Sequence, residues 1–223
     1  INIKNFYCIE ALIESNPEII EFINIPNPKD KKISELAVNA KQSGIKTLNK
    51  SKDFYAACKE PAVRDIKSAN YEIGKSVLIF DEVQDTRNLG SCLRTASFFG
   101  INSVIIPKNN SADFNNTAVI ETSTGGVYDL DLYKVANISQ TINKLKENNY
   151  WVTGFSEHAK KDINTLVPSE KNVFVFGNEQ KGIKQLVLKN CDEVLKIKQI
   201  GQTSSLNISI AAAIATYTLT NKI

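Results

Sequence analysis

The sequence predicts an α/β protein whose sheet is mostly parallel and is covered by helices on both faces. The main observation is a series of short, mainly apolar segments, at 76–80, 103–107, 150–155, 172–177 and 193–197. Between them lie segments with helical periodicity, at 89–99, 137–148 and 183–190. Strands that are apolar throughout and alternate with helices are typical of a parallel sheet buried on both faces.

The amino-terminal part predicts a smaller α/β unit. Helices are expected over 5–15 and over 31–44, where Gly44 supplies the stop, and strands over 21–26 and 45–50. Residues 59–74 have no clear period and contain Pro61, so they are interpreted as a connector. We therefore expect two domains, 1–70 and 75–223, with a boundary near 70–75.

Composition narrows the class of protein. The chain has 223 residues, is 42% hydrophobic and 23% charged, and carries a net charge of +3, which permits nucleic-acid binding without requiring it. No apolar run approaches the roughly 18 residues of a membrane span, and no signal peptide is evident, so a cytoplasmic protein with no membrane partner is expected. Because the sequence contains no methionine, we rely on motifs that are internally contiguous.

Cysteine and histidine usage argues against a metal site. The four cysteines are far apart and form no C-x-x-C pair, which predicts neither zinc nor disulfides. The single histidine, His158, lies in the polar run "SEHAKKD" and is interpreted as a solvated loop residue. Metal-ligand clusters and histidine-based catalytic triads are thereby nearly excluded, and no metal is expected.

Two familiar nucleotide motifs fail on inspection. Gly74-Lys75-Ser76 resembles the end of a P-loop, but it precedes a strand, and Ala69 stands where the first glycine belongs. No G-x-G-x-x-G follows any predicted strand. A ligand is nevertheless expected beyond the carboxyl ends of the strands, as in other parallel sheets.

The first candidate segment is "DEVQDTRNLGSCLRTASFFG", residues 81–100. On a helical wheel its apolar residues share one face, and Arg94 lies nearly opposite. Asn88 stands at the helix start. The simplest alternatives are that Arg94 is a solvated helix residue and that Asn88 is only an N-cap.

The second candidate segment is "NVFVFGNEQKGIKQL", residues 172–186. A buried strand opens at Gly177 and leads to Glu179 and Gly182. Glycines at such a strand end allow the backbone to approach a ligand, and Glu179 can accept hydrogen bonds. The alternative is an ordinary glycine turn with a solvated glutamate.

The third candidate segment is "IKQIGQTSSLNISIAAAIATYTL", residues 197–219. From Ile208 to Ala215 it is apolar almost all round, which predicts a helix buried on every side. Ser205 and Asn207 stand at the amino end of that helix. Capping accounts for one of them and does not easily account for both.

Together, in this order, the three segments resemble the three motifs of the SpoU family of RNA ribose 2′-O-methyltransferases. The resemblance runs through residues 76–219. The family's usual Asp-Pro is Asp85-Thr86 here, and its usual Ile-Pro-Met is Ile197-Lys198-Gln199. The amino-terminal part is similar to the small substrate-binding domain, like a ribosomal-protein fold, of the ribosomal members.

The resemblance implies a parallel sheet whose carboxyl-terminal segment forms a deep trefoil knot, a feature that periodicity does not predict. It implies S-adenosylmethionine as cofactor, no metal, a homodimer whose sites gather residues from both chains, and RNA as substrate. Ribosomal RNA is the expected substrate because of the extra domain. The alternatives are the same chemistry on tRNA and a non-catalytic RNA-binding or ribosome-assembly factor.

The resemblance also implies a set of site residues. Arg94 is expected near the target ribose, where it either acts as general base or stabilises the developing alkoxide. Asn88 is expected to position Arg94 or the RNA. The remaining residues expected to order the site are Glu179, Ser205 and Asn207. Those expected to hold the cofactor, mainly through backbone groups, are Gly154, Phe155, Gly177, Gly182, Ile197, Ile200 and Leu206.

Overall fold

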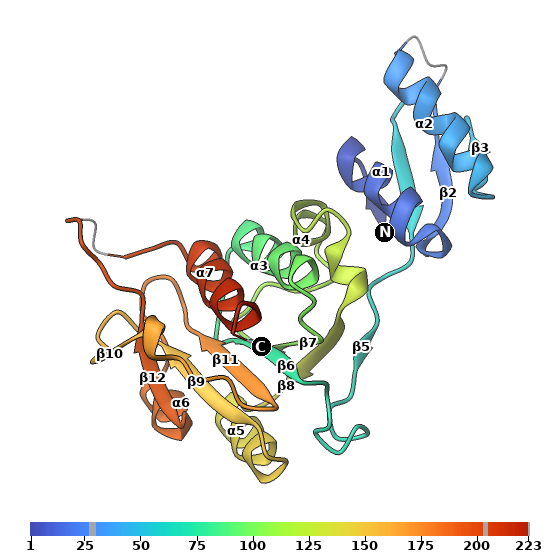
Figure 1. Ribbon diagram of the computed structural model, residues 1–223. Coiled ribbons are helices and arrows are strands. Elements are labelled where there is room, and N and C mark those ends of the chain that lie inside the picture. The colour runs from blue at the N-terminus through green and yellow to red at the C-terminus, as the bar shows by residue number, and fades with distance from the viewer. Residues whose placement is uncertain (27–29, 203–204, 223) are drawn as a thin grey trace.

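The computed structural model describes residues 1–26, 30–202 and 205–222, and its larger part is an eight-stranded sheet (Figure 1). All neighbouring strands in this sheet are parallel. The strand order is β10-β12-β9-β11-β6-β7-β8-β5. The bounds are β5 Val63–Arg64, β6 Ser76–Phe80, β7 Ser103–Pro107, β8 Asp131–Val135, β9 Trp151–Phe155, β10 Lys161–Asp162, β11 Asn172–Phe176 and β12 Glu193–Lys196.

Helices cover both faces of this sheet, as the apolar strands predicted. On one face pack α3 (Thr86–Phe98), α4 (Thr117–Thr122) and α7 (Ile208–Thr220), and on the other α5 (Ile138–Glu147) and α6 (Gln185–Asn190). Alternate strand residues supply the two cores. Leu78, Phe80 and Phe174 face the first group, whereas Val77 and Ile79 face the second.

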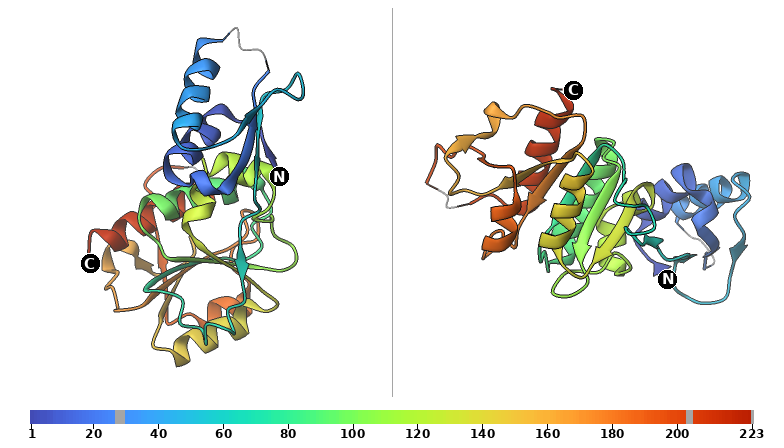
Figure 2. Two further views of the ribbon diagram at one scale, coloured as in Figure 1. Left: turned by 90° about the vertical axis from the view of Figure 1, so that its right-hand side faces the viewer. Right: turned by 90° about the horizontal axis from the view of Figure 1, so that it is seen from below.

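The amino-terminal part forms a second sheet of four strands in the order β1-β4-β2-β3. Its strands are β1 Asn2–Ile3, β2 Ile20–Asn24, β3 Thr47–Leu48 and β4 Tyr55–Cys58, and its helices are α1 Phe6–Ser15 and α2 Lys31–Gln42. Figure 2 shows both helices on the same side of this sheet. The helix bounds agree with the prediction within two residues at each end, and β3 is shorter than the predicted strand.

Five strands were not predicted from the sequence: the two-residue strands β1 and β10, and β4, β5 and β8, the last three of which each have a local reason. In β8, Asp131 and Lys134 interrupt the apolar residues, so the strand lacks a continuous apolar run. β4 is rich in alanine, which has low strand propensity. β5 has two exposed residues, lies inside the segment interpreted as a connector, and pairs with β8 at the edge of the large sheet.

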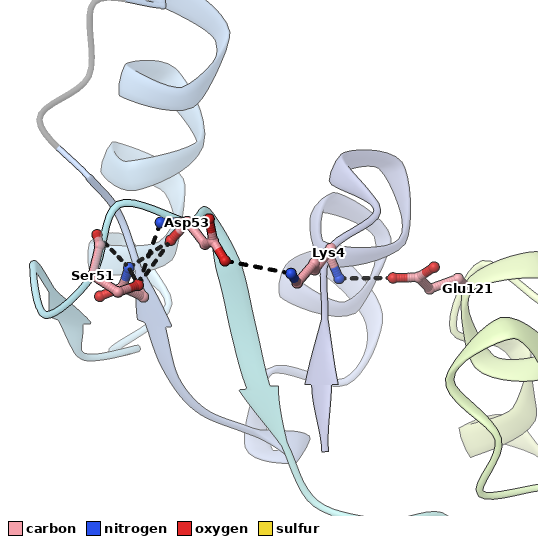
Figure 3. Close-up of polar contacts among 5 residues, drawn as sticks. Lys4, Ser51, Asp53 and Glu121 are labelled. Atoms are coloured by element: carbon pink, nitrogen blue, oxygen red, sulfur yellow. Dashed lines mark hydrogen bonds and ion pairs between the residues drawn. The ribbon is translucent and has the colours of Figure 1, made fainter.

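The two parts of the chain share one hydrophobic core. Leu12 of α1 lies close enough to Gly125 that an added β-carbon there would approach its side chain to 2.9 Å. The Cys8 thiol donates a hydrogen bond to the Ile120 carbonyl. Glu121 of α4 accepts the backbone N–H groups of Lys4 and Asn5, at 2.7 and 3.0 Å, and Figure 3 shows its contact with Lys4. The α1 end of the small sheet is thus fastened to α4.

Helix α7 corrects the expectation of a helix buried on every side. Ala212, Ala215 and Leu219 are buried against α3 and the sheet, but Ile210 and Tyr217 are 49% and 58% exposed. The composition of the helix is apolar all round, yet the residues that the structure describes cover only one of its faces. This leaves an apolar surface exposed on the monomer.

Candidate active site

The candidate site lies at the carboxyl ends of β6 and β11, which are neighbours at the centre of the sheet. The chain builds β7 and β8 on one side of β6, and then crosses over to build β9, β11 and β12 on the other. The strand order therefore changes direction here. In parallel α/β sheets, ligands bind at such a switch point, beyond the carboxyl ends of the strands.

Helix α3 follows β6, and its amino end is capped by Asp85. The Asp85 carboxylate accepts the backbone N–H groups of Arg87 and Asn88, at 2.8 and 2.9 Å. The alternative in which Asn88 is only an N-cap is therefore wrong. Asn88 lies inside the first turn, and its side-chain amide is free to make other contacts.

The Asn88 side chain connects the three segments. Its Nδ2 donates to Glu179 Oε1 at 3.0 Å, and its Oδ1 accepts from Asn207 Nδ2 at 2.9 Å. Residues 91 and 119 positions away from Asn88 thus meet at one amide. An amide suits this place because it donates and accepts at the same time.

Each partner of Asn88 is itself held by its own loop. Asn178 and Gly182 exchange two backbone hydrogen bonds, and the Asn178 side chain accepts the N–H groups of Gln180 and Lys181, so Glu179 stands at the tip of a closed loop. Asn207 caps α7 by accepting the Ser209 N–H at 2.8 Å. A single residue thus both caps α7 and joins the hydrogen-bonded chain.

Arg94 lies on the exposed face of α3, as the helical wheel predicted, while Leu89, Cys92, Leu93 and Ala96 are fully buried. It lines a shallow cavity of about 220 Å³ with Thr95, Phe98 and Phe99. Among the described residues, no hydrogen bond joins Arg94 to Glu179, Asn88 or Asn207. Ser205 is exposed just beyond residues 203–204, which lie outside the described part, and no described hydrogen bond joins it to these three residues either.

The residues expected to hold the cofactor fall into two groups. Gly177 and Gly182 are in contact, because a β-carbon on Gly177 would come within 2.1 Å of the Gly182 backbone. Phe155 stacks on Phe176, and Gly154 is buried beside Cys191.

The second group lies on the segment after β12. Ile197 lines a depression of about 630 Å³, together with Glu157, Asp162, Asn164, Lys196, Lys198 and Gln199. Ile200 and Leu206 are 91% and 50% exposed. The described contacts do not bring these three residues to the Gly177 loop.

Sequence reasoning missed the charged residues that flank the site. Asp81 directly follows β6 and is buried, and its partner Lys184 lies beyond the Gly177 loop. Burial raises the pKa of the Asp81 carboxyl. The signal that could have found Asp81 is a carboxylate immediately after a buried parallel strand. His158 is exposed and lies beside Glu157, as predicted.

Two further findings concern membranes and metals. No helix within residues 1–26, 30–202 and 205–222 is long and apolar enough to cross a bilayer. In the same part of the chain, histidine, cysteine, aspartate and glutamate side chains form no group of three or more that could hold a metal ion. The four cysteines are free thiols.

A parallel sheet with polar side chains at its switch point is the architecture of many ligand-binding α/β proteins. A family model described as the SpoU rRNA Methylase family matches residues 75–217, and the chain belongs to this family. A Staphylococcus aureus protein named for the TrmH family of tRNA/rRNA methyltransferases is 34% identical over 231 residues, which cover 96% of this chain and 92% of that protein. The present chain therefore belongs to the class of S-adenosylmethionine-dependent RNA methyltransferases.

Solved structures share the fold along almost the whole chain. The SpoU methyltransferase AviRb from Streptomyces viridochromogenes, in complex with AdoMet, matches with a TM-score of 0.79 at 18% identity and covers 99% of this chain and 89% of that one. A structure described as an RNA 2′-O ribose methyltransferase matches with a TM-score of 0.79 at 19% identity and covers 99% and 88%. At these identities the likeness establishes the fold.

S-adenosylmethionine is the cofactor of this family, and the residues present fit it. Cofactor pockets in proteins typically measure roughly 300–1,000 Å³, and the depression beside Ile197 lies in that range. Glu157 and Asp162 line it together with Lys196 and Lys198, so it offers both signs of charge to a molecule that carries a sulfonium, an ammonium and a carboxylate.

Proposed function

We propose that the chain transfers a methyl group from S-adenosylmethionine to the 2′-hydroxyl of a ribose in RNA, with ribosomal RNA as substrate and tRNA as the alternative. The observation that carries the proposal is the hydrogen-bonded chain Glu179–Asn88–Asn207 at the switch point of the sheet. These three residues come from the three segments that resemble the family's motifs. A packing role would not require three polar side chains to meet at a partly exposed strand end.

Arg94 is the residue proposed to act on the ribose. An arginine guanidinium is a fixed cation in proteins, so the minimal role of this residue is to stabilise the alkoxide that forms as the 2′-hydroxyl loses its proton. Action as a general base is the alternative role. The exposure of Arg94 leaves its guanidinium accessible to an RNA backbone. Asn88, Glu179, Ser205 and Asn207 are proposed to order the surrounding loops.

The cofactor-binding role is assigned to the backbone of two loops. One carries Gly177 and Gly182, next to Gly154 and Phe155. The other runs from Ile197 through Ile200 to Leu206. When bound, S-adenosylmethionine supplies an electrophilic methyl group on a sulfonium. The protein has to align the ribose oxygen with that methyl and exclude water, and no metal is needed for this.

The finer features of the fold belong to the same proposal. We assign residues 1–70 to an RNA substrate-binding domain similar to a ribosomal-protein fold, and 75–223 to the catalytic domain, to whose sheet β5 adds an edge strand from the first segment. The segment between β12 and α7 is proposed to thread a deep trefoil knot. The pairing of β12 with both β9 and β10 supports this, because it brings the segment beside the loop between β9 and β11. Cytoplasmic location is part of the proposal.

A homodimer is proposed through the exposed faces of α7 and α3. Tyr217 packs on Phe99 at a ring-centroid distance of 6.1 Å, and the neighbouring Phe98 is 81% exposed. Together with Ile210 they form an apolar surface that reaches the cavity of Arg94. A second copy on this surface would place one chain's Arg94 against residues of the other chain, where it could act on a site shared by both.

The test is a map of 2′-O-methylation in total RNA from cells with and without the protein, followed by single-turnover transfer to the RNA found. We expect one or a few ribose positions in ribosomal RNA to lose the modification. Loss confined to tRNA would select the alternative substrate. Binding of RNA without any methyl transfer, by protein that binds S-adenosylmethionine, would favour the non-catalytic assembly factor.

A further inference from the structure

Glu82, between β6 and α3, has a backbone conformation that disfavours its side chain. Its φ is +63°, in the left-handed region. A residue with a β-carbon is strained there, whereas glycine adopts the same conformation freely. Strain of this kind persists where neighbouring structure holds it, often near functional sites, and it directs attention to what the side chain does.

The contacts of Glu82 join three loops at the carboxyl edge of the sheet. Its Oε1 accepts from Lys184 Nζ at 2.7 Å and from Asn110 Nδ2 at 3.1 Å, and its backbone carbonyl accepts from Asn178 Nδ2 at 2.9 Å. Asn110 follows β7, whereas Asn178 and Lys184 follow β11. A glycine could supply the carbonyl contact but neither of the carboxylate contacts.

Lys184 completes the connection from the other side. Its Nζ lies 4.0 Å from Asp81 Oδ1, and its backbone N–H donates to Asp81 Oδ2 at 3.3 Å. The Asp81 carboxylate is 1% exposed. The hydrogen bond from Lys184 is the main cause that lowers the pKa of Glu82, and the same bond is the main cause that raises the pKa of Lys184. Both groups are therefore charged at neutral pH.

The loop held in this way is the one that presents Glu179. Asn178 stands at its beginning and Lys184 just beyond its end, and both contact Glu82. The loop between them is closed by the Asn178–Gly182 bridge. The position of the Glu179 carboxylate relative to Asn88 therefore depends on how both ends of the loop are fastened to the segment that precedes α3.

We propose that Glu82 and Lys184 are positioning residues for methyl transfer, and that their ion pair fixes the 178–184 loop so that Glu179 stays within hydrogen-bond reach of Asn88. This rests on the proposed role of the Glu179–Asn88–Asn207 chain. The left-handed glutamate is then a compromise, in which backbone strain is tolerated because the carboxylate orders the site. Sequence patterns do not reveal the pair, whose members lie 102 positions apart.

The decisive variant is Glu82→Gly, because it separates stability from activity. Glycine relieves the left-handed strain, so the melting temperature should stay the same or rise. The carboxylate is lost, so the maximal rate of methyl transfer should fall about tenfold or more, as expected for a small misplacement of site residues, with little change in KM for RNA. A residue with a merely structural role would show the reverse, a lower melting temperature with an unchanged rate.

Variants of Lys184 test the other partner. Lys184→Met should lower the rate by a similar factor, and Lys184→Arg, which keeps the charge and the donors, should retain most of it. The double variant Glu82→Gly with Lys184→Met should be no slower than the slower single variant, because both remove the same interaction. Effects that multiply in the double variant would overturn the proposal.

Two matched controls use features remote from the site. Asn149→Gly removes a left-handed asparagine with φ of +66° at the end of α5. Lys144→Met removes an ion pair of 2.7 Å with Glu147 on the same helix. Both should transfer methyl groups at the wild-type rate.

A final measurement keeps the proposal independent of the assigned activity. Hydrogen exchange at the Gly182 N–H, which donates to the Asn178 carbonyl, should be faster in Glu82→Gly and Lys184→Met than in the wild type. If the wild type methylates no ribose, the proposed function fails. Faster exchange in the variants would still support the proposal that the Glu82–Lys184 ion pair fixes the 178–184 loop. Wild-type exchange in both variants, or a wild-type rate in Glu82→Gly, would refute it.

Discussion

The two loops assigned to the cofactor differ in how firmly the chain holds them. The Gly177 loop is bridged across its own base and fastened to the segment before α3. In the second loop, residues 198–202 and 205–206 are instead exposed, and Ile200 is almost fully so. One wall of the site is therefore set before any ligand arrives. Under the proposed assignment, the other would gain its contacts from the cofactor or from a second copy of the chain.

Arg94→Ala is the change expected to have the largest effect, and it tests whether the exposed arginine belongs to the site at all. Loss of one group that stabilises developing negative charge typically lowers the rate by about 100-fold or more. S-adenosylmethionine affinity and melting temperature should stay near the wild-type values, because Arg94 is exposed and its removal opens no cavity. Single-turnover transfer and calorimetry on the same preparation measure both. If the variant transfers methyl groups at the wild-type rate, Arg94 is only a solvated helix residue.

Alanine substitutions at Gly177 and Gly201 test directly whether the first loop is held more firmly than the second. A β-carbon on Gly177 would lie 2.1 Å from backbone atoms of Gly182 and Ile183, whereas one on Gly201 would meet nothing within 4 Å. Gly177→Ala should destabilise the fold by about 3 kcal/mol, which corresponds to a fall in melting temperature of roughly 6–12 °C. Gly201→Ala, the matched control, should melt like the wild type. Equal melting temperatures would mean that the Gly177 loop is less firmly held than described.

Leu206→Arg tests whether the second, exposed loop contributes to the affinity for the cofactor. Because Leu206 is half exposed, an arginine can reach water there, and the stability of the cofactor-free protein should change by less than about 0.5 kcal/mol. Cofactor affinity should nevertheless fall about tenfold, which is about 1.4 kcal/mol, since a cation would face a positively charged ligand. Calorimetric titration with S-adenosylmethionine decides the matter. Unchanged affinity would remove Leu206 from the proposed cofactor loop.

An effect of the same size, on association, is expected from Tyr217→Lys, which tests whether a second copy covers the exposed face of α7. Tyr217 is more than half exposed in one copy, so the substitution should hardly alter the stability of a monomer. It should weaken dimerisation about tenfold, or about 1.4 kcal/mol, because each charge would be buried on association. Light scattering over a dilution series measures the shift. A wild-type protein that stays monomeric at micromolar concentration would contradict the dimer itself.

The architecture was largely predictable, because continuous apolar strands such as 76–80 and 172–176 have few other uses in a globular protein. The polar residues could be selected from the sequence as well, since they stand at strand and helix ends. Their contacts were not predictable. That Asp85 caps α3, leaving Asn88 free to reach Glu179, depends on backbone geometry at one turn. The pairing of Glu82 with Lys184 depends on the order of strands in the sheet.

The exposed face of α7 shows a different limit. Apolar residues surround the helix in sequence, and the pattern cannot distinguish burial inside one chain from burial between two. Only the packing of α7 on α3 reveals that Ile210 and Tyr217 are left uncovered. Periodicity reports which faces are apolar, whereas their partners are a property of the three-dimensional arrangement.

The continuous core between α1 and the segment around α4 has a consequence for the order in which the protein folds. The side chains of Cys8 and Leu12 are covered by residues near Ile120 and Gly125. During synthesis, α1 therefore emerges more than a hundred residues before its covering surface. Domains made first usually fold first. Here part of the apolar face of α1 stays uncovered until the residues around α4 have been synthesised. We therefore expect the small sheet and the large sheet to reach their final stability in a single cooperative step.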